Sequence, residues 1–149
     1  MEVFRIVQAQ YAKSFNASGC ANRWNKKDEW VLYAGASRSL ASLELLVHQG
    51  QALPKPDSCV MVISIPDDAA FMSSINPKQL PANWRSLNAY PILQKLGSQW
   101  YQAQSTLVLK IPSVIIPNEF NYAINTKHPD FKKHIKKVRI ESFFWDERL

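Results

Sequence analysis

Several polar side chains of this sequence have the chemistry needed to hold and activate a small charged substrate. An arginine guanidinium can grip phosphate oxygens with two parallel hydrogen bonds, and a tyrosine ring can stack on a flat heterocycle, especially a cationic one. A glutamate with apolar neighbours must be paired or have a specific task, because burying a carboxylate is costly. The residues of these kinds that we single out are Arg5, Arg23, Tyr33, Glu44 and Ser113.

Each of these residues also has an ordinary structural interpretation. The two arginines could lie on the surface, and Tyr33 could belong to the core. Ser113 directly follows a proline, where serine commonly makes a turn. Glu44 stands between two leucines and could lie at the polar edge of an amphipathic helix. Spacing alone does not decide between these readings.

The first half of the sequence predicts the elements that would position these side chains. Residues 3–7 alternate as in a short strand, and residues 30–34 are rich in the β-branched and aromatic types that favour strands. Ser37 is a typical N-cap for a helix over residues 38–49, and Gly50 is a typical residue after a helix C-terminus.

The predicted helix places Glu44 one turn from Leu40 and one turn from His48, on the side that carries the apolar stripe. The residues expected in that stripe are Leu40, Leu43, Leu46 and Val47. His48 is expected to hydrogen-bond near its own helix end. This strand–helix unit would present Tyr33 and Glu44 to one cleft, and Arg23 would enter from the loop before the strand.

The second half of the sequence predicts further strands and one more helix. Residues 59–65 form a near-continuous apolar strand, and residues 66–88 are loop-like because prolines interrupt them. The remaining expectations are a helix over residues 90–104 that Gly97 weakens, two short strands within 105–117 hinged at Pro112, an asparagine-rich turn region over 118–131, and a final strand from Lys136. Strands and helices follow one another without a βαβ rhythm, which favours an α+β fold in a single domain over residues 1–149.

Composition limits the class of protein. With 149 residues, 46% of them hydrophobic, the chain can bury a proper core in one domain. No apolar run approaches the roughly 20 residues that cross a bilayer, and the N-terminus does not resemble a secretory signal. Cys20 and Cys59 have no metal-ligand spacing and are expected as free thiols. These features favour a cytoplasmic protein without a membrane partner.

The net charge of +6 comes from the second half of the chain. Residues 1–75 hold seven basic and seven acidic side chains, whereas residues 76–149 hold eleven basic and five acidic ones. Much of the excess lies in KKHIKK at 132–137. Such a cluster could attract nucleic acid, an acidic partner or an anionic cofactor, or could be a solvated face next to a strand. No nucleic-acid-binding module accompanies it.

Common catalytic and nucleotide-binding signatures are absent from the sequence. There is no GxGxxG, GxxxxGK[ST], HExxH or GxSxG. The three histidines, at 48, 128 and 134, lack zinc-ligand spacing, so no metal site is expected. Nucleotide phosphates, if bound, must be held by side chains and turns.

A series of short stretches, taken in order, resembles a known family. The stretches are Arg23-Trp24-Asn25, VLYA at 31–34, SLASLELLVH with Glu44, IPSVIIP with Ser113, NYAIN at 121–125 and HPDF at 128–131. Together they resemble the RES domain family, the toxin half of RES–Xre toxin–antitoxin systems, which is named for an arginine, a glutamate and a serine. Two departures are Ala21-Asn22, where the family usually has glycines, and Asn125-Thr126-Lys127, where it usually has Asn-Pro.

The resemblance implies a fold similar to ADP-ribosyltransferases of the diphtheria-toxin type, with a split, mainly antiparallel β-core flanked by helices. It implies NAD+ as substrate, without a metal, and cleavage of the nicotinamide–ribose bond. The products would be free ADP-ribose or its phosphate, from hydrolysis or phosphorolysis that depletes NAD+. Alternatively, ADP-ribose would be transferred to a protein. A cognate Xre-like helix-turn-helix antitoxin would cover the NAD+ pocket and make any contact with DNA.

The resemblance also implies roles for the residues singled out above. Glu44 would stabilise a ribose with oxocarbenium character, while Arg23 and Arg5 would hold the pyrophosphate. Tyr33 would stack on the nicotinamide, and Ser113 would orient the ribose or the carboxamide. Trp24 and Asn25 are counted with the binding residues.

Several alternatives stay open at this point. The family serine could be Ser98 or Ser105 instead of Ser113. The chain could also be a nucleic-acid-binding or nuclease-like module that uses the basic cluster, or an interaction domain that has lost catalysis. The acceptor of ADP-ribose and the oligomeric state are not fixed by the sequence.

Overall fold

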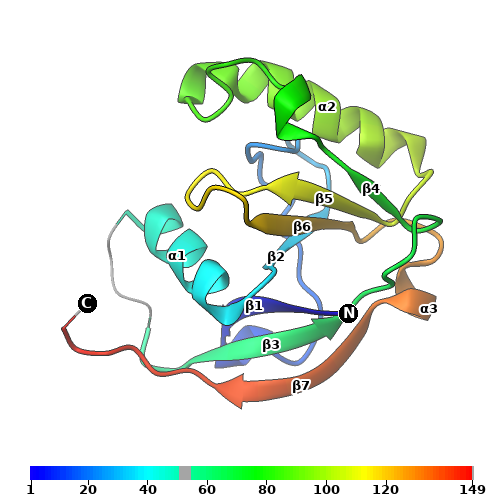
Figure 1. Cartoon of the computed structure of the whole chain (residues 1–149). Helices are drawn as coiled ribbons and strands as arrows, with labels where there is room; N and C mark the ends of the chain where they lie inside the picture. The colour runs from blue at the N-terminus through cyan, green and yellow to red at the C-terminus, as the bar shows by residue number, and fades with distance from the viewer. Residues whose placement is uncertain (51–54, 149) are drawn as a thin grey trace.

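A single seven-stranded sheet forms the centre of the computed structural model, which describes residues 1–50 and 55–148 (Figure 1). The strands are β1 (Glu2–Gln8), β2 (Val31–Gly35), β3 (Ser58–Ser64), β4 (Met72–Ser74), β5 (Val108–Pro112), β6 (Phe120–Asn125) and β7 (Lys136–Ser142). The helices are α1 (Arg38–His48), α2 (Tyr90–Ala103) and the short α3 (Phe131–His134), with 3-10 turns η1 (Ala9–Tyr11), η2 (Pro77–Gln79) and η3 (Leu87–Ala89). This arrangement confirms the predicted α+β fold.

The sheet is split between β1 and β2. The strand order is β4-β5-β6-β2-β1-β3-β7, and only the β4–β5 pairing is parallel. β1 and β2 share a single pair of residues, Phe4 and Gly35, whereas β1 pairs with β3 along its whole length. The predicted split, mainly antiparallel core is therefore confirmed, and the two halves diverge next to Arg5.

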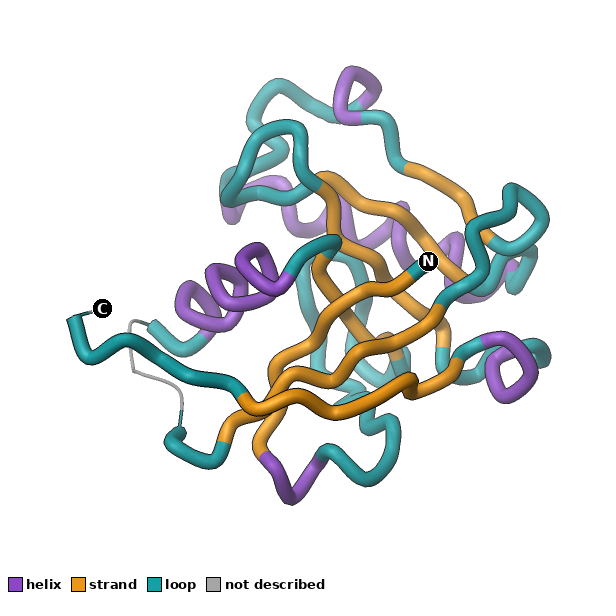
Figure 2. Tube along the Cα trace, turned by 60° about the horizontal axis from the view of Figure 1, so that its bottom comes forward, coloured by secondary structure: helices purple, strands orange, loops and turns teal. Residues whose placement is uncertain are grey.

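Side chains from both halves of the sheet meet in one core, and the long helices cover the other faces. The central cluster takes Val3 from β1, Leu32 from β2, Met61 from β3 and Ile124 from β6. A second cluster packs α2 on β5, β6 and β2, and a third, smaller one packs α1 on β1 and β3. In Figure 2 these two helices lie apart from each other on the outside of the strands. The weak β1–β2 pairing therefore lies between the strands that α1 packs on and those that α2 packs on.

The ends of α1 follow the sequence signals closely. The Ser37 side chain accepts a hydrogen bond from the backbone N–H of Leu40, as an N-cap should. Gly50 follows the helix with φ of +60°, the left-handed conformation that glycine adopts without strain. The predicted apolar stripe is only partly correct, because Leu40 is buried but Leu43 and Val47 are 36% and 63% exposed.

Two predictions for the second half of the chain are wrong. Residues after Pro112 do not form a second strand, because the Ser113 hydroxyl accepts the backbone N–H groups of Ile115 and Ile116 and closes a turn. The asparagine-rich stretch is not all turn, since Phe120–Asn125 is strand β6 in the middle of the sheet. Within the loop-like stretch 66–88 the structure adds the short strand β4.

Candidate active site

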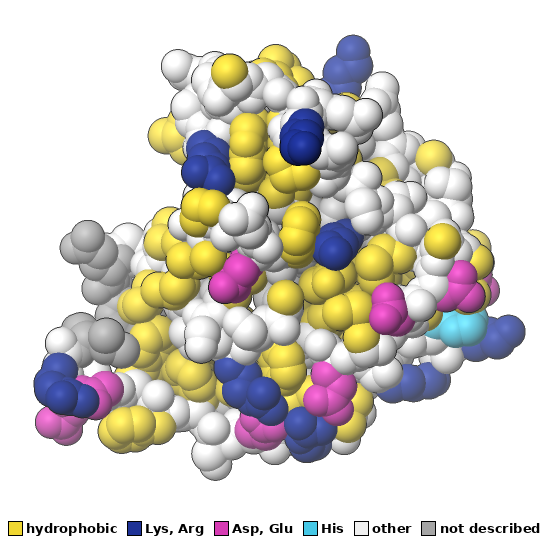
Figure 3. All heavy atoms as spheres, viewed as in Figure 1, with side chains coloured by type: hydrophobic (Ala, Val, Ile, Leu, Met, Phe, Trp, Pro, Cys, Tyr) yellow, Lys and Arg dark blue, Asp and Glu magenta, His cyan; other side chains and the backbone are white. Residues whose placement is uncertain are grey.

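A cavity of about 400 Å³ lies beside the split in the sheet, lined by α1, the loop that precedes β2, the first residue of α2 and the turn after β5. The side chains that line it include Arg5, Arg23, Tyr33, Glu44 and Asn121. Four of these come from the residues singled out in the sequence, from four different elements or loops. On the face seen in Figure 3, hydrophobic side chains are exposed between the regions of α1 and α2, with charged side chains among them. The cavity therefore combines apolar walls with a few charged groups.

Glu44 is held through one of its two carboxylate oxygens. Oε1 accepts hydrogen bonds from Asn121 Nδ2 at 2.5 Å and from Ser113 Oγ at 3.2 Å. Among the described residues no donor is bonded to Oε2. The carboxylate is thus fixed in place with one oxygen still able to accept a hydrogen bond from a ligand.

The geometry distinguishes among the three candidate serines. Ser113 is 2% exposed, and its hydroxyl accepts two backbone N–H groups, which leaves its proton for Glu44. Ser98 instead donates to Glu29, and Ser105 lies exposed after α2. Ser113 is therefore the serine that contacts the candidate glutamate. It is not among the residues that line the cavity, so it holds Glu44 without facing a ligand.

Asn121 lines the cavity and contacts Glu44, and we did not predict it from the sequence. It lies at the start of β6, opposite Gly35 of β2, and reaches Glu44 across 77 positions of sequence. In the sequence, Asn121 stands out only as the first residue of NYAIN, one of the stretches that carry the family resemblance. Its buried Oδ1 has no hydrogen-bond partner among the described residues, so its amide is oriented by the bond that it donates to Glu44.

Both arginines of the cavity bond to backbone carbonyls. Arg5 Nη1 donates to the Tyr33 carbonyl at 2.9 Å, a group that faces the opening between β1 and β2. Arg23 Nη1 donates to the carbonyls of Trp84 and Ser86 at 3.1 and 3.3 Å. Burial lowers the pKa of the Arg5 guanidinium, because desolvation disfavours its charged form. Within the described residues neither arginine forms an ion pair.

Tyr33 is anchored through its hydroxyl, which donates to Asn25 Oδ1 at 2.6 Å. Burial, followed by the charge of nearby Glu29, raises the pKa of Tyr33, so the phenol stays protonated. Asn25 is 1% exposed, and its side-chain amide donates hydrogen bonds to the carbonyls of Cys20 and Lys26. Asn25 is not among the residues that line the cavity. The structure therefore makes it a support of Tyr33 rather than a ligand contact, contrary to our prediction.

Trp24 lines the cavity and is 3% exposed, packed against Trp84 with ring centroids 6.5 Å apart. Its backbone carbonyl lies against Gly97 of α2, where an added Cβ would be 1.7 Å from the carbonyl oxygen. Gln94 of α2 also donates to the Asn22 carbonyl at 2.8 Å. The glycine that weakens α2 in the sequence thus allows the helix to hold the Arg23 loop closely.

The remaining sequence predictions concern residues away from the cavity centre. His48 lines the cavity rim on α1 and is exposed. Both cysteines are free, with Cys20 exposed and Cys59 buried. The basic cluster lies on α3 and β7 and does not line the cavity, and its Lys137 donates to the carbonyls of Ala12 and Lys13.

The described residues contain neither a membrane-spanning helix nor a group of metal-binding side chains. None of the helices in that part of the chain has the length and hydropathy of a membrane span. Within residues 1–50 and 55–148, no three histidine, cysteine, aspartate or glutamate side chains are grouped closely enough to hold a metal ion.

The cavity can bind a ligand that carries both signs of charge. Two guanidiniums suit phosphate oxygens, a tyrosine ring suits a flat cationic heterocycle, and the free oxygen of Glu44 suits a hydroxyl or a developing positive charge. The three charged groups are held by neutral partners, so a ligand does not have to break an ion pair to reach them.

This chain is similar to a known protein family over nearly its whole length. The family model for the RES domain matches residues 2–146. A protein of Yersinia enterocolitica named "Toxin Res" is 33% identical over 153 residues, covering 100% of this chain and 99% of its own. A protein of Sphingobium sp. named "Prs ADP-ribosylating toxin" is 34% identical over 146 residues, covering 97% and 90%.

A solved structure shows the same fold at low sequence identity. The crystal structure of the M. tuberculosis MbcT–MbcA toxin–antitoxin complex contains a chain that superposes with a TM-score of 0.67. The match covers 94% of this chain and 79% of that one, at 12% identity.

Proposed function

Because this chain belongs to the RES domain family, we propose that it is an enzymatic toxin of a toxin–antitoxin system and that its substrate is NAD+. The proposal includes cleavage of the nicotinamide–ribose bond in the cavity beside β2. It also includes action in the cytoplasm, under the control of a cognate antitoxin.

One observation carries the proposal. Two arginines and one glutamate line a single cavity, and each is held by neutral groups rather than by an opposite charge. NAD+ has the complementary pattern, with an anionic pyrophosphate and a cationic nicotinamide ring joined through ribose. All three side chains are half-buried. A charged group that is partly removed from water without an ionic partner loses hydration, and a ligand that supplies the partner offsets that loss.

Binding would divide the charges of NAD+ among the cavity side chains. Arg23 and Arg5 hold the pyrophosphate, since guanidinium groups match phosphate oxygens in geometry and charge. The Tyr33 ring, fixed by Asn25, stacks on the nicotinamide, whose positive charge favours an aromatic face. Trp24 supplies an apolar wall.

The reaction would break the bond between ribose C1′ and the nicotinamide nitrogen. The bonding electron pair leaves with the nitrogen, so nicotinamide departs as a neutral ring and needs no proton from an acid. Positive charge then develops on the ribose, as in glycoside hydrolysis. Glu44 stabilises that charge and accepts a hydrogen bond from a ribose hydroxyl through its free oxygen. Ser113 and Asn121 keep the carboxylate in position.

The acceptor that attacks C1′ distinguishes two forms of this activity. With water or inorganic phosphate the enzyme depletes NAD+, and this is the form we propose. With a protein nucleophile it would be an ADP-ribosyltransferase, a candidate favoured by the name of the Sphingobium relative.

Purified protein incubated with NAD+, with and without phosphate, tests the proposal by chromatography of the products. We expect nicotinamide release by the wild type and about a hundredfold slower release by Glu44→Gln, which keeps the size of the side chain but removes the charge that stabilises the transition state. If Glu44→Gln folds normally and releases nicotinamide at the wild-type rate, the proposed role of Glu44 is wrong. Radiolabel from NAD+ in a protein band would identify the transferase form.

The antitoxin is proposed to dock at the mouth of the cavity. Val47 is 63% exposed on α1 and lines the cavity together with Val114 and Ile115 of the turn after β5. Apolar side chains at the entrance would let a partner segment seal the site. The solved neighbour is itself a toxin–antitoxin complex, and an Xre-like helix-turn-helix protein is the partner that the family leads us to expect.

A further inference from the structure

Glu29 is the one acidic side chain that is buried among the described residues, at 5% exposed. Its carboxylate accepts hydrogen bonds from the Ser98 hydroxyl and from Gln102 Nε2 at 3.4 Å, both on α2, and from the backbone N–H of Lys26 at 2.8 Å. In the described part of the chain no lysine, arginine or histidine forms an ion pair with it. Its oxygens accept three hydrogen bonds and donate none, as an ionised carboxylate does.

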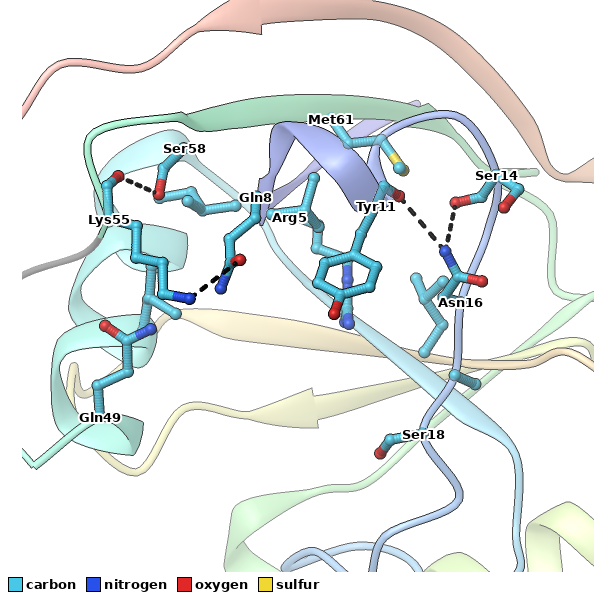
Figure 4. Close-up of a pocket in the computed structure, with 15 residues that line it drawn as sticks. Arg5, Gln8, Tyr11, Ser14, Asn16, Ser18, Gln49, Lys55, Ser58 and Met61 are labelled. Carbon is cyan, nitrogen blue, oxygen red and sulfur yellow. Dashed lines mark hydrogen bonds between the residues drawn. The ribbon is translucent and has the colours of Figure 1, made fainter.

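Glu29 does not face a ligand-sized cavity. It is not among the residues that line the candidate active site. Nor does it line a second cavity, of about 500 Å³, whose walls include Arg5 and Gln8 of β1 and Tyr11 of η1 (Figure 4). Any effect of the Glu29 charge on a ligand must therefore act through other residues.

A short series of buried contacts leads from Glu29 to the Tyr33 ring. Asn25 directly precedes the Lys26 N–H that binds the carboxylate, and its Nδ2 lies 3.4 Å from the Glu29 carbonyl oxygen. The Tyr33 hydroxyl donates to Asn25 Oδ1 at 2.6 Å. The charge of Glu29 acts over this range, because after burial it is the next cause that raises the pKa of the Tyr33 hydroxyl.

A buried negative charge near an aromatic ring affects stacked ligands according to their own charge. A cation on the face of the ring is attracted by the ring itself and by the carboxylate, which protein screens less than water would. An uncharged ring gains only the stacking contact. Oxidised and reduced nicotinamide dinucleotides provide this contrast, since the nicotinamide of NAD+ is cationic, that of NADH is neutral, and the rest of the molecule is the same.

We infer that Glu29 makes the candidate active site prefer the cationic nicotinamide ring of NAD+ over the uncharged ring of NADH, acting through Tyr33 from outside the cavity. This inference rests on the proposed function and identifies a residue that sets the charge selectivity of the same site. If Glu29 only tied the Lys26 loop to α2, its loss would affect the binding of both dinucleotides alike.

The relative binding of the two dinucleotides tests this inference. NADH binding is followed by its fluorescence, and NAD+ is titrated as a competitor, in the Glu44→Gln background so that NAD+ is not consumed. One test variant is Glu29→Gln, which removes the charge but leaves the Lys26 N–H without its acceptor. The other is Gln102→Lys, which keeps that bond and would place an ammonium group beside the carboxylate from an exposed position.

The matched control is Asp28→Asn, which removes the same charge from the neighbouring, exposed position. Asparagine tolerates the positive φ of 64° that Asp28 adopts. Melting temperatures show whether each variant is folded. If Glu29→Gln does not fold, Gln102→Lys decides the question alone. Nicotinamide release by the wild type is measured in parallel.

We expect each test variant to raise the Kd of NAD+ relative to that of NADH by about three- to tenfold, the order expected for one unit charge acting through partly hydrated protein. Asp28→Asn should change this ratio by less than about twofold, because water and salt screen an exposed charge. In proteins that retain Glu44, the test variants should raise the KM for NAD+ without lowering kcat, since the nicotinamide ring loses its charge in the transition state.

Equal changes in the two dissociation constants, or an unchanged ratio in folded Gln102→Lys, would overturn the inference and leave Glu29 a structural tie between the loop and α2. An effect of Asp28→Asn as large as that of Glu29→Gln would also overturn it. Binding of neither dinucleotide would overturn both the inference and the proposed substrate. If the ratio depends on Glu29 but the wild type releases no nicotinamide, the proposed reaction fails while the charge preference stands.

Discussion

Replacing Gly97 by alanine tests how closely α2 holds the loop that carries Arg23. In an exposed helix this substitution would stabilise the protein by about 1 kcal/mol, because alanine has the higher helix propensity. Here we expect the opposite sign. The new Cβ would lie 1.7 Å from the Trp24 carbonyl oxygen, and real Cβ contacts are essentially never under 3.0 Å.

The size of the effect follows from that overlap. Moving the oxygen from 1.7 to 3.0 Å requires a shift of about 1.3 Å in backbone that cannot rotate away. Overpacking of this kind costs about 3 kcal/mol at the upper end of its range, and the gain in helix propensity offsets about 1 kcal/mol. The net loss is about 2 kcal/mol, or roughly 4–8 °C in Tm for a chain of this size.

Displacement of the Trp24 backbone should also move Arg23 in the candidate active site, because the two residues are adjacent in the loop. Displacing a positioning group by about 1 Å can reduce turnover about a hundredfold, so kcat/KM for NAD+ should fall by at least tenfold. Thermal unfolding and steady-state kinetics measure the two effects. Gln99→Ala, at an exposed position of the same helix, is the control for helix propensity. A Tm for Gly97→Ala equal to or above the wild-type value would refute the packing argument.

Three further predictions concern single contacts. Asn121→Ala removes a hydrogen bond to the Glu44 carboxylate that is worth about 1.5–3 kcal/mol. Steady-state kinetics should show kcat reduced about 10- to 100-fold with little change in KM. An unchanged kcat would contradict the role of Asn121 in holding Glu44. Ser37→Ala removes the cap on the Leu40 N–H and should lower the free energy of unfolding by about 1 kcal/mol, as denaturant titration would show; an unchanged midpoint would count against it. Hydrogen bonds from two arginines lower the pKa of Glu141 from 4.5 to about 2. The stabilisation of the folded protein by these hydrogen bonds is therefore present above pH 4.5 and lost as the pH falls towards 2. The free energy of unfolding of Glu141→Gln should depend less on pH in that window than that of the wild type. The same pH dependence in both proteins would contradict this linkage.

Local signals in the sequence were enough to predict α1 and its boundaries. Ser37 and Gly50 act within one turn of their own positions, so their effect does not depend on the rest of the fold. The strands β1, β2 and β3 were also predicted, because alternating or continuous apolar residues need only a sheet to pack in. These elements bring Arg5, Tyr33 and Glu44 to the same part of the molecule.

Several of the errors concern polar side chains whose bonding partners the sequence does not reveal. Asn121 and Asn125 made β6 resemble turn sequence, since asparagine is common in turns, yet Asn125 donates to the Tyr101 carbonyl and Asn121 donates to Glu44. Ser113 turns the chain although β-branched residues follow it. A side-chain bond across 69 or 77 residues leaves no periodic signal in one sequence. This explains why Asn121 was missed. Asn25 differs, since its partners Cys20, Lys26 and Tyr33 lie within eight positions of it, and only the structure shows that it supports Tyr33 without lining the cavity.

The way the charged groups are held connects the fold to the proposed chemistry. If Arg5 were paired with Glu44, a substrate would have to separate that ion pair before it could bind either group. The structure instead holds Arg5 with a backbone carbonyl and Glu44 with a hydroxyl and an amide. These neutral partners orient each charged side chain without neutralising it. Oriented charged groups of this kind are well suited to stabilise charge that develops in a transition state. The carbonyl that holds Arg5 belongs to Tyr33 and faces Arg5 where β1 and β2 diverge. The same split in the sheet thus opens the cleft and supplies the acceptor that orients its arginine.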